Sequence, residues 1–95
     1  MVLKVGFIGA GGMARNHMKK ISTMPNVKIS AICDVAIEKA REAGRMYHAS
    51  VYSDFHDMID KEDLDAVWIA IPPFAHSDEV EYAAERGVHC FIEKP

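Results

Sequence analysis

The chain has 95 residues, which fits one domain or part of one. Apolar residues make up 49% and charged residues 26%, a balance typical of a globular chain and not of a disordered one. The net charge of −3, without a block of Lys or Arg, argues against nucleic acid and acidic membranes as partners. Apolar runs have the length of strands and the N-terminus lacks a signal-peptide layout, so we expect no transmembrane helix and a cytoplasmic location.

Strand and helix patterns alternate from one end of the chain to the other. The first half predicts strands over 2–8 and 27–33, and helices over 12–23 and 36–47. A short strand over 50–52 follows, and Ser53 or Asp54 is expected to cap a short helix that carries Phe55. The second half predicts a strand over 66–71, a helix over 75–86 that ends at Gly87, and a strand over 88–92.

This alternation defines the fold class. Strands joined by helices of this length form right-handed crossovers and therefore a parallel sheet with helices on both faces. The strands are continuously apolar, as expected where a sheet is buried on both sides. We therefore predict an α/β fold with a doubly wound parallel sheet of five strands in the order 3-2-1-4-5. Residues 1–95 are expected to form this one domain, which is incomplete because no sixth strand follows.

A glycine-rich loop lies between the first strand and the first helix. Its sequence GAGGMA matches the pattern G-x-G-x-x-A with Gly9, Gly11 and Ala14. Gly9 would permit the tight turn, Gly11 would let a pyrophosphate approach the backbone, and Ala14 would keep the helix close to the sheet. The helix N-terminus that follows favours phosphate. We predict that this loop, including Gly12 and Met13, binds a dinucleotide; the alternative is a tight turn without a ligand.

An acidic residue ends the second strand. Asp34 follows the glycines at a spacing close to the roughly 20 residues typical of the acid that binds the adenosine ribose. A carboxylate there accepts hydrogen bonds from the ribose hydroxyls and repels a 2′-phosphate, and no arginine immediately follows it. NAD is therefore favoured over NADP. The alternative is that Asp34 only caps the next helix.

The segment IAIPPFAHSDEV begins at the end of the fourth strand. Two prolines force a rigid turn at the edge of the sheet where ligands of such folds bind, and His76 is expected in the first turn of the next helix. His76 either contacts the ligand or packs and caps. His17 is interpreted as structural or solvated, and Trp68 as a core residue. Cysteines are few and form no CxxC pair, so buried free thiols are expected, with no metal site.

Four stretches together resemble one known family. GFIGAGGMARNH, AICD, AIPPFAH and above all FIEKP are similar to the glucose–fructose oxidoreductase, inositol dehydrogenase and MocA family, over essentially the whole chain. The resemblance implies a Rossmann domain that binds NAD(P), joined to a separate α/β domain that binds a sugar, a polyol or a related molecule. It therefore implies a nicotinamide-dependent oxidoreductase that acts on a CH–OH group.

The resemblance also implies roles for individual residues. Lys94 would be the active-site lysine beside the nicotinamide, and Glu93 would lie at the nicotinamide end of the cofactor. Ile71, Pro72 and His76 would line the cofactor groove, although Ile71 stands where many members of the family have threonine. No substrate domain follows Pro95, so the 95-residue chain is expected to be inactive by itself.

Two other functions share part of this pattern. A non-catalytic module that senses NAD(H) would need the glycines and Asp34 but not the EKP motif. A methyltransferase that binds S-adenosylmethionine would also use a glycine-rich loop, but the proline turn and EKP argue against it. The apolar last strand lacks a neighbour, so the chain is expected to associate with copies of itself as a homo-oligomer.

Overall fold

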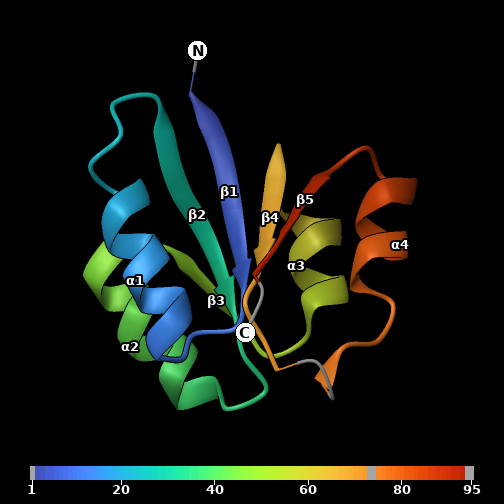
Figure 1. Ribbon diagram of the computed structural model, residues 1–95, viewed down its shortest axis with the longest axis horizontal. Coiled ribbons are helices and arrows are strands. Elements are labelled where there is room, and N and C mark those ends of the chain that lie inside the picture. Colours follow the sequence, from blue (N-terminus) through green and yellow to red (C-terminus); the bar gives the residue numbers. More distant parts are fainter. Residues whose placement is uncertain (1, 73–74, 94–95) are drawn as a thin grey trace.

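One parallel sheet with helices on both faces forms the structure (Figure 1). The computed structural model describes residues 2–72 and 75–93. Within them the strands are β1 (Leu3–Ile8), β2 (Val27–Cys33), β3 (Ser50–Tyr52), β4 (Ala66–Ile69) and β5 (His89–Ile92). The helices are α1 (Gly12–Ile21), α2 (Ile37–Tyr47), α3 (Phe55–Lys61) and α4 (Glu79–Glu85). All neighbouring strands pair in parallel in the order β3-β2-β1-β4-β5, which confirms the predicted fold class.

Two hydrophobic cores lie on opposite faces of the sheet. Helices α1 and α2 cover one face and α3 and α4 cover the other (Figure 1). Successive side chains of a strand point to opposite faces, so β1 gives Phe7 to the first core and Ile8 to the second. Met18 of α1 is fully buried in the first core and Met58 of α3 in the second. Burial on both faces explains why the central strands lack polar alternation.

The helix boundaries follow local chemistry. Asp54 is the N-cap of α3, and its carboxylate accepts a hydrogen bond from the backbone N–H of His56 at 2.9 Å, which confirms one of the two expected caps. Gly87 follows the C-cap of α4 with φ +73°, a left-handed conformation that suits glycine and confirms its predicted place. These caps fix where the chain turns back toward the sheet.

Two predicted boundaries near the fourth strand are wrong. Strand β4 ends at Ile69 and not at Ile71, because its partner β1 ends at Ile8 and the chain of β1 then enters the glycine loop. Helix α4 begins at Glu79 and not at residue 75. The side chain of Glu79 turns back to accept a hydrogen bond from the Ser77 N–H at 2.8 Å, which holds the preceding residues in a loop.

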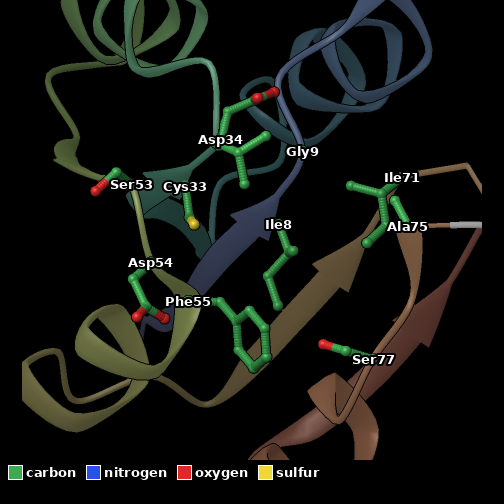
Figure 2. Close-up of a pocket in the computed structure, with 11 residues that line it drawn as sticks. Ile8, Gly9, Cys33, Asp34, Ser53, Asp54, Phe55, Ile71, Ala75 and Ser77 are labelled. Carbon is green, nitrogen blue, oxygen red and sulfur yellow. The ribbon is translucent and has the colours of Figure 1, made fainter.

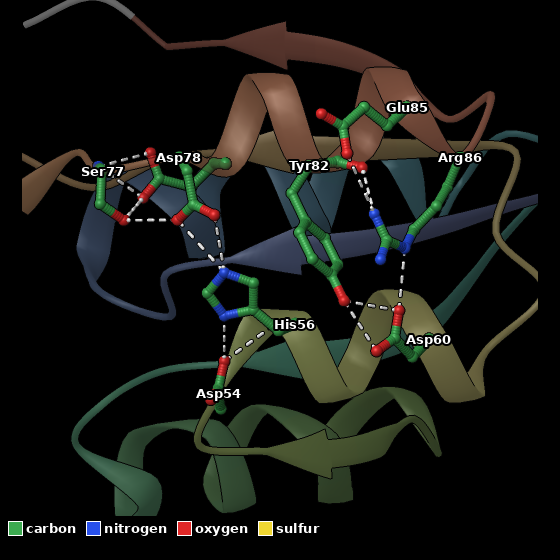
Figure 3. A network of polar contacts seen from close by, with 9 residues as sticks. Asp54, His56, Asp60, Ser77, Asp78, Tyr82, Glu85 and Arg86 are labelled. Atoms are coloured by element: carbon green, nitrogen blue, oxygen red, sulfur yellow. Dashed lines mark hydrogen bonds and ion pairs between the residues drawn. The ribbon is translucent and has the colours of Figure 1, made fainter.

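A polar network joins α3 to α4 (Figure 3). The ring of His56 bridges Asp54 and Asp78, with N–O distances of 2.7 and 2.9 Å. Hydrogen bonds to Asp78 and then Asp54 raise the pKa of His56 above its usual value. Nearer the other end of these helices, Asp60 accepts hydrogen bonds from the Tyr82 hydroxyl and from an Arg86 N–H. The network fixes the two helices that border one face of the sheet.

The β5 side of the sheet carries exposed apolar surface. Phe91 is 51% exposed and Ile92 52%, and β5 is an edge strand within the described residues. An apolar groove runs beside it on the α1 face; among its lining residues are Leu3, Val5, Ile21, Met24, Val27, Ala66, Trp68 and Phe91. Trp68 was expected in the core but is only partly buried, because the helices on that face cover other strands. No helix of the described residues is long and apolar enough to cross a membrane.

Candidate functional site

The predicted site residues meet at one edge of the sheet. Parallel strands end together, and the carboxyl ends of β1, β2, β4 and β5 lie at the lower end of the view in Figure 1. Gly9 follows β1, Asp34 follows β2, and Glu93 follows β5. The strand order reverses between β1 and β4, and ligands of doubly wound sheets bind at such a point.

Gly9 makes the sharp turn out of β1. Its φ of +108° is a conformation that residues with a side chain rarely adopt. Its N–H donates to the carbonyl of Cys33 at 2.7 Å, so the turn is tied to the end of β2. A Cβ atom at Gly9 would lie only 2.4 Å from the carbonyl oxygen of Ala70. Glycine is therefore required both by the conformation and by the close approach of the β4 chain.

The next residues open toward solvent. Gly11 is the N-cap of α1 and offers no capping side chain, and a Cβ atom at Gly11 or Gly12 would have no neighbour within 4 Å. The first N–H groups of this 10-residue helix are thus accessible, a geometry that suits a phosphate. Ala14 is fully buried and lets α1 pack closely on the sheet, as predicted. Met13 is 46% exposed and lies at the same opening.

Asp34 holds the glycine loop in place. One carboxylate oxygen accepts a hydrogen bond from the Ala10 N–H at 2.9 Å, and the other accepts one from the Ala36 N–H at 2.8 Å. Each oxygen keeps one further lone pair for a ligand hydroxyl. Asp34 is not the N-cap of α2, because Ala36 occupies that position, so the alternative of a simple capping role is wrong.

An arginine lies near this end of the site, which the sequence pattern did not indicate. Arg15 extends from α1 toward the first turn of α2, where its Nη2 donates to the carbonyl of Lys39 at 3.3 Å. Its Nε donates to the carbonyl of Ala10 at 3.1 Å. The guanidinium is paired with Glu42 at 2.9 Å, and this pair holds the pKa of Glu42 below its usual value. The positive charge near the glycine loop is therefore already matched by a carboxylate.

Two clefts flank the glycine loop. The first cleft, of about 350 Å³, lies at the ends of β2 and β3 (Figure 2). It is lined by Ile8, Gly9, Cys33, Asp34, Val35, Ser53, Asp54, Phe55, Ile71, Ala75 and Ser77. Ile71 and Ala75 close it on the side opposite Asp34 (Figure 2). Ser53 and Phe55 were not predicted as site residues, although their position after the third strand places them at the same edge.

Cys33 faces the first cleft but is not a reactive thiol. Burial and the neighbouring Asp34 carboxylate raise its pKa to about 12. The thiol therefore stays protonated at neutral pH and packs as a small apolar group. Cys33 and Cys90 are both free, as predicted.

The second cleft, of about 330 Å³, lies at the ends of β4 and β5. It is lined by Gly11, Gly12, Met13, Ala70, Ile71, Pro72 and Glu93. Six of the predicted cofactor residues, Glu93 among them, thus share one concave surface. Ile71 lines both clefts and separates them together with the glycine loop. Such a pair of clefts on either side of a glycine loop suits the two halves of a dinucleotide.

His76 does not lie in the first turn of a helix, as predicted, but in the loop before α4, where a backbone carbonyl holds its ring. It precedes α4, and its Nε2 donates to the carbonyl of Ile71 at 3.2 Å. Its Nδ1 lies 3.6 Å from the carboxylate of Glu79, which is 2% exposed. His76 therefore supports the loop that carries Ile71 and Pro72; direct contact with a cofactor stays a prediction.

Two residues contact the carboxylate of Glu93 at the second cleft, and the sequence did not predict either contact. His17 of α1 pairs with Glu93 at 2.6 Å, and Trp68 of β4 donates its Nε1–H to the same carboxylate oxygen at 3.1 Å. The sequence placed neither near Glu93, because His17 lies in α1, Trp68 lies in β4 and Glu93 follows β5. The predicted active-site residue Lys94, and the second proline of the turn, Pro73, lie outside the described residues.

The match to a family model defines the class of protein. Residues 3–95 match the GFO_IDH_MocA model, described as an oxidoreductase family with an NAD-binding Rossmann fold. The chain belongs to this family, which confirms the resemblance and the expected class of cofactor.

Individual relatives are longer proteins. An uncharacterized oxidoreductase of Bacillus subtilis, YrbE, is 34% identical over 91 residues, which are 95% of this chain and 27% of that protein. Inositol 2-dehydrogenase of Salmonella typhimurium is 33% identical over 98 residues, 100% of this chain and 29% of that protein. The chain therefore spans less than a third of the length of these relatives.

Solved structures show the same fold. Scyllo-inositol dehydrogenase of Lactobacillus casei, with bound NAD(H) and scyllo-inositol, superposes with a TM-score of 0.91 at 32% identity, over 100% of this chain and 28% of that one. Myo-inositol dehydrogenase of Lactobacillus casei, in complex with NAD(H) and myo-inositol, gives a TM-score of 0.91 at 35% identity, over 100% of this chain and 29% of that one.

Proposed function

We propose that this chain is the cofactor-binding part of an NAD-dependent oxidoreductase that oxidises a CH–OH group of a sugar or polyol, with inositols as the first candidates. The observation that carries the proposal is the pair of clefts that meet at Gly9–Ala14 and end at Asp34 and Glu93. The family description and the inositol dehydrogenases among the relatives support it. A cytoplasmic location stays a prediction.

Different parts of the cofactor are assigned to different groups of the described residues. The free N–H groups at the start of α1 bind the diphosphate, and Asp34 accepts hydrogen bonds from the adenosine ribose. The first cleft encloses the adenosine and the second cleft the nicotinamide. NAD, when bound, supplies the hydride acceptor. By resemblance, Lys94 assists removal of the hydroxyl proton of the substrate.

Substrate recognition is assigned to groups outside these 95 residues. Hydride transfer requires a second wall over the nicotinamide and a route for the proton. The relatives extend well beyond the matched region, so a separate substrate domain is proposed for the whole oxidoreductase. The 95-residue chain is expected to bind cofactor without turnover.

Calorimetry and turnover assays test the proposal separately. The 95-residue chain should bind NADH, and the whole oxidoreductase should reduce NAD with a panel of inositols and sugars. S-adenosylmethionine serves as the control ligand and should not bind. Absence of NADH binding would overturn the cofactor role. Binding without turnover on any polyol would favour the alternative of an NAD(H)-sensing module.

Asp34 is predicted to set the preference for NADH over NADPH. Replacing Asp34 with alanine removes hydrogen bonds to the ribose and also the bond to the Ala10 N–H, so NADH affinity should fall about ten- to hundredfold. The difference in affinity between NADH and NADPH should become smaller. Adding Glu42→Gln frees Arg15 from its partner and should raise NADPH affinity further. Calorimetry with both cofactors gives the measurement.

Glu42→Gln alone is the matched control for that experiment. With Asp34 in place it should change NADH affinity less than about threefold, because the side chain of Glu42 is 61% exposed and lines neither of the two clefts. Equal or tighter binding of NADPH by the unmodified chain would refute the assignment of Asp34.

Association into a homo-oligomer is predicted from the β5 edge. Phe91 is half-exposed beside an apolar groove, and covering it in a contact between copies removes apolar surface from water. Phe91→Lys should therefore weaken association about tenfold or more. Met46→Lys, at a residue of α2 that is 61% exposed, is the control and should leave the strength of association unchanged. Light scattering over a concentration series decides; a strictly monomeric native chain would contradict the prediction.

A further inference from the structure

The carboxylate of Glu93 is held by side chains from two other elements. Oε2 lies 2.6 Å from Nε2 of His17 and 3.1 Å from Nε1 of Trp68. A carboxylate oxygen only accepts, so both ring nitrogens act as donors to one atom. The backbone of Glu93 is fixed as well, because its N–H donates to the carbonyl of Ile69 at 2.9 Å. Main chain and carboxylate are therefore both anchored.

The two donors are themselves fixed by ring packing. The ring centroids of His17 and Trp68 are 5.0 Å apart at an angle of 31°. Trp68 also stacks on Phe91 of β5 at 5.2 Å and on Phe7 of β1 at 6.1 Å. The indole cannot rotate without losing these contacts, so its N–H direction is determined before any ligand arrives.

We propose that His17 is a positioning residue which, with Trp68, fixes the Glu93 carboxylate at the wall of the second cleft for contact with the nicotinamide half of NAD. The inference rests on the proposed function. The side chains of His17 and Glu93 are 24% and 21% exposed, so the pair is screened but the carboxylate still borders the cleft. An unanchored glutamate would lose side-chain freedom when the cofactor binds, and this cost is removed in advance.

A purely structural role of the contact between His17 and Glu93 would affect cofactor binding differently from a positioning role. If the contact only fastened α1 to the end of β5, its loss would lower stability and weaken both halves of the cofactor to a similar extent. If it positions Glu93, its loss weakens only ligands that carry the nicotinamide. ADP-ribose contains the adenosine, diphosphate and second ribose of NAD but lacks the nicotinamide, so it distinguishes these roles.

The experiment compares NADH and ADP-ribose in calorimetry with the native chain and three variants. His17→Phe keeps a ring against Trp68 but removes the donor, and Trp68→Phe removes the other donor. Each should weaken NADH about tenfold and leave ADP-ribose within about twofold. His17→Gln places an amide nitrogen near the position of Nε2 and should restore most of the NADH affinity. Thermal unfolding by circular dichroism checks that each variant is folded.

Each outcome has one meaning. Equal loss of NADH and ADP-ribose in His17→Phe, or no loss of either, would overturn the positioning role while leaving the proposed function intact. Equal affinity of the native chain for the two ligands would also overturn it, because the nicotinamide would then gain nothing from the wall at Glu93. Failure of the native chain to bind either ligand would instead refute the proposed function.

Discussion

Replacing Gly9 with alanine is expected to destabilise the chain by about 3 kcal/mol or more and to abolish NADH binding. The backbone strain of a side chain at φ +108° costs on the order of 1 to 3 kcal/mol. The added Cβ would also meet the carbonyl oxygen of Ala70 at 2.4 Å, and neither β1 nor β4 can move without disturbing the centre of the sheet. Denaturant unfolding and calorimetry measure the two effects.

Gly12→Ala is the matched control for this prediction. A Cβ atom at Gly12 has no protein neighbour within 4 Å, and Gly12 begins a helix, where alanine is favoured. Stability should therefore stay the same or rise by up to about 1 kcal/mol. NADH binding should nevertheless weaken, because the new methyl group occupies the opening through which the diphosphate approaches. Similar stability of the Gly9→Ala and native chains would contradict the role given to Gly9.

The overall fold was predictable because its information is local. Each strand is a short apolar run bounded by turn residues, and the handedness of parallel crossovers then limits the strand order. Gly9 and Asp34 were predictable for a related reason. They lie directly after strands, and the topology brings the ends of those strands together at one edge.

The errors arise where side chains from distant segments decide the outcome. The helix predicted over 75–86 begins four residues before the real start of α4 at Glu79. Only the hydrogen bond between Glu79 and Ser77 shows where the helix begins. Arg15 was overlooked because its partners Lys39 and Glu42 belong to α2, which is distant from it in the sequence. The contact of His17 with Glu93 joins two segments that are distant in sequence, and no periodicity indicates it.

The EKP motif includes Lys94, a residue outside the described part of the chain, for which only the sequence gives information. Glu93 is tied to Ile69 and borders the second cleft, so the chain leaves β5 beside the proposed place of the nicotinamide. Lys94 is the next residue along the chain. Its role as the active-site lysine stays a proposal that rests on the family resemblance and on this position in the sequence.

In the whole oxidoreductase, Lys94→Ala is expected to reduce turnover by about 10² to 10⁴, the usual contribution of a general acid–base group. The dissociation constant for NADH should change less than about fivefold, because the proposed binding of the cofactor depends mainly on the glycine loop and Asp34. Single-turnover kinetics and calorimetry on the same preparation separate the two quantities. Lys94→Arg keeps the positive charge, but the guanidinium does not give up its proton near neutral pH. This variant should therefore be nearly as slow as Lys94→Ala. Near-normal turnover by either variant on the true substrate would show that another group removes the proton.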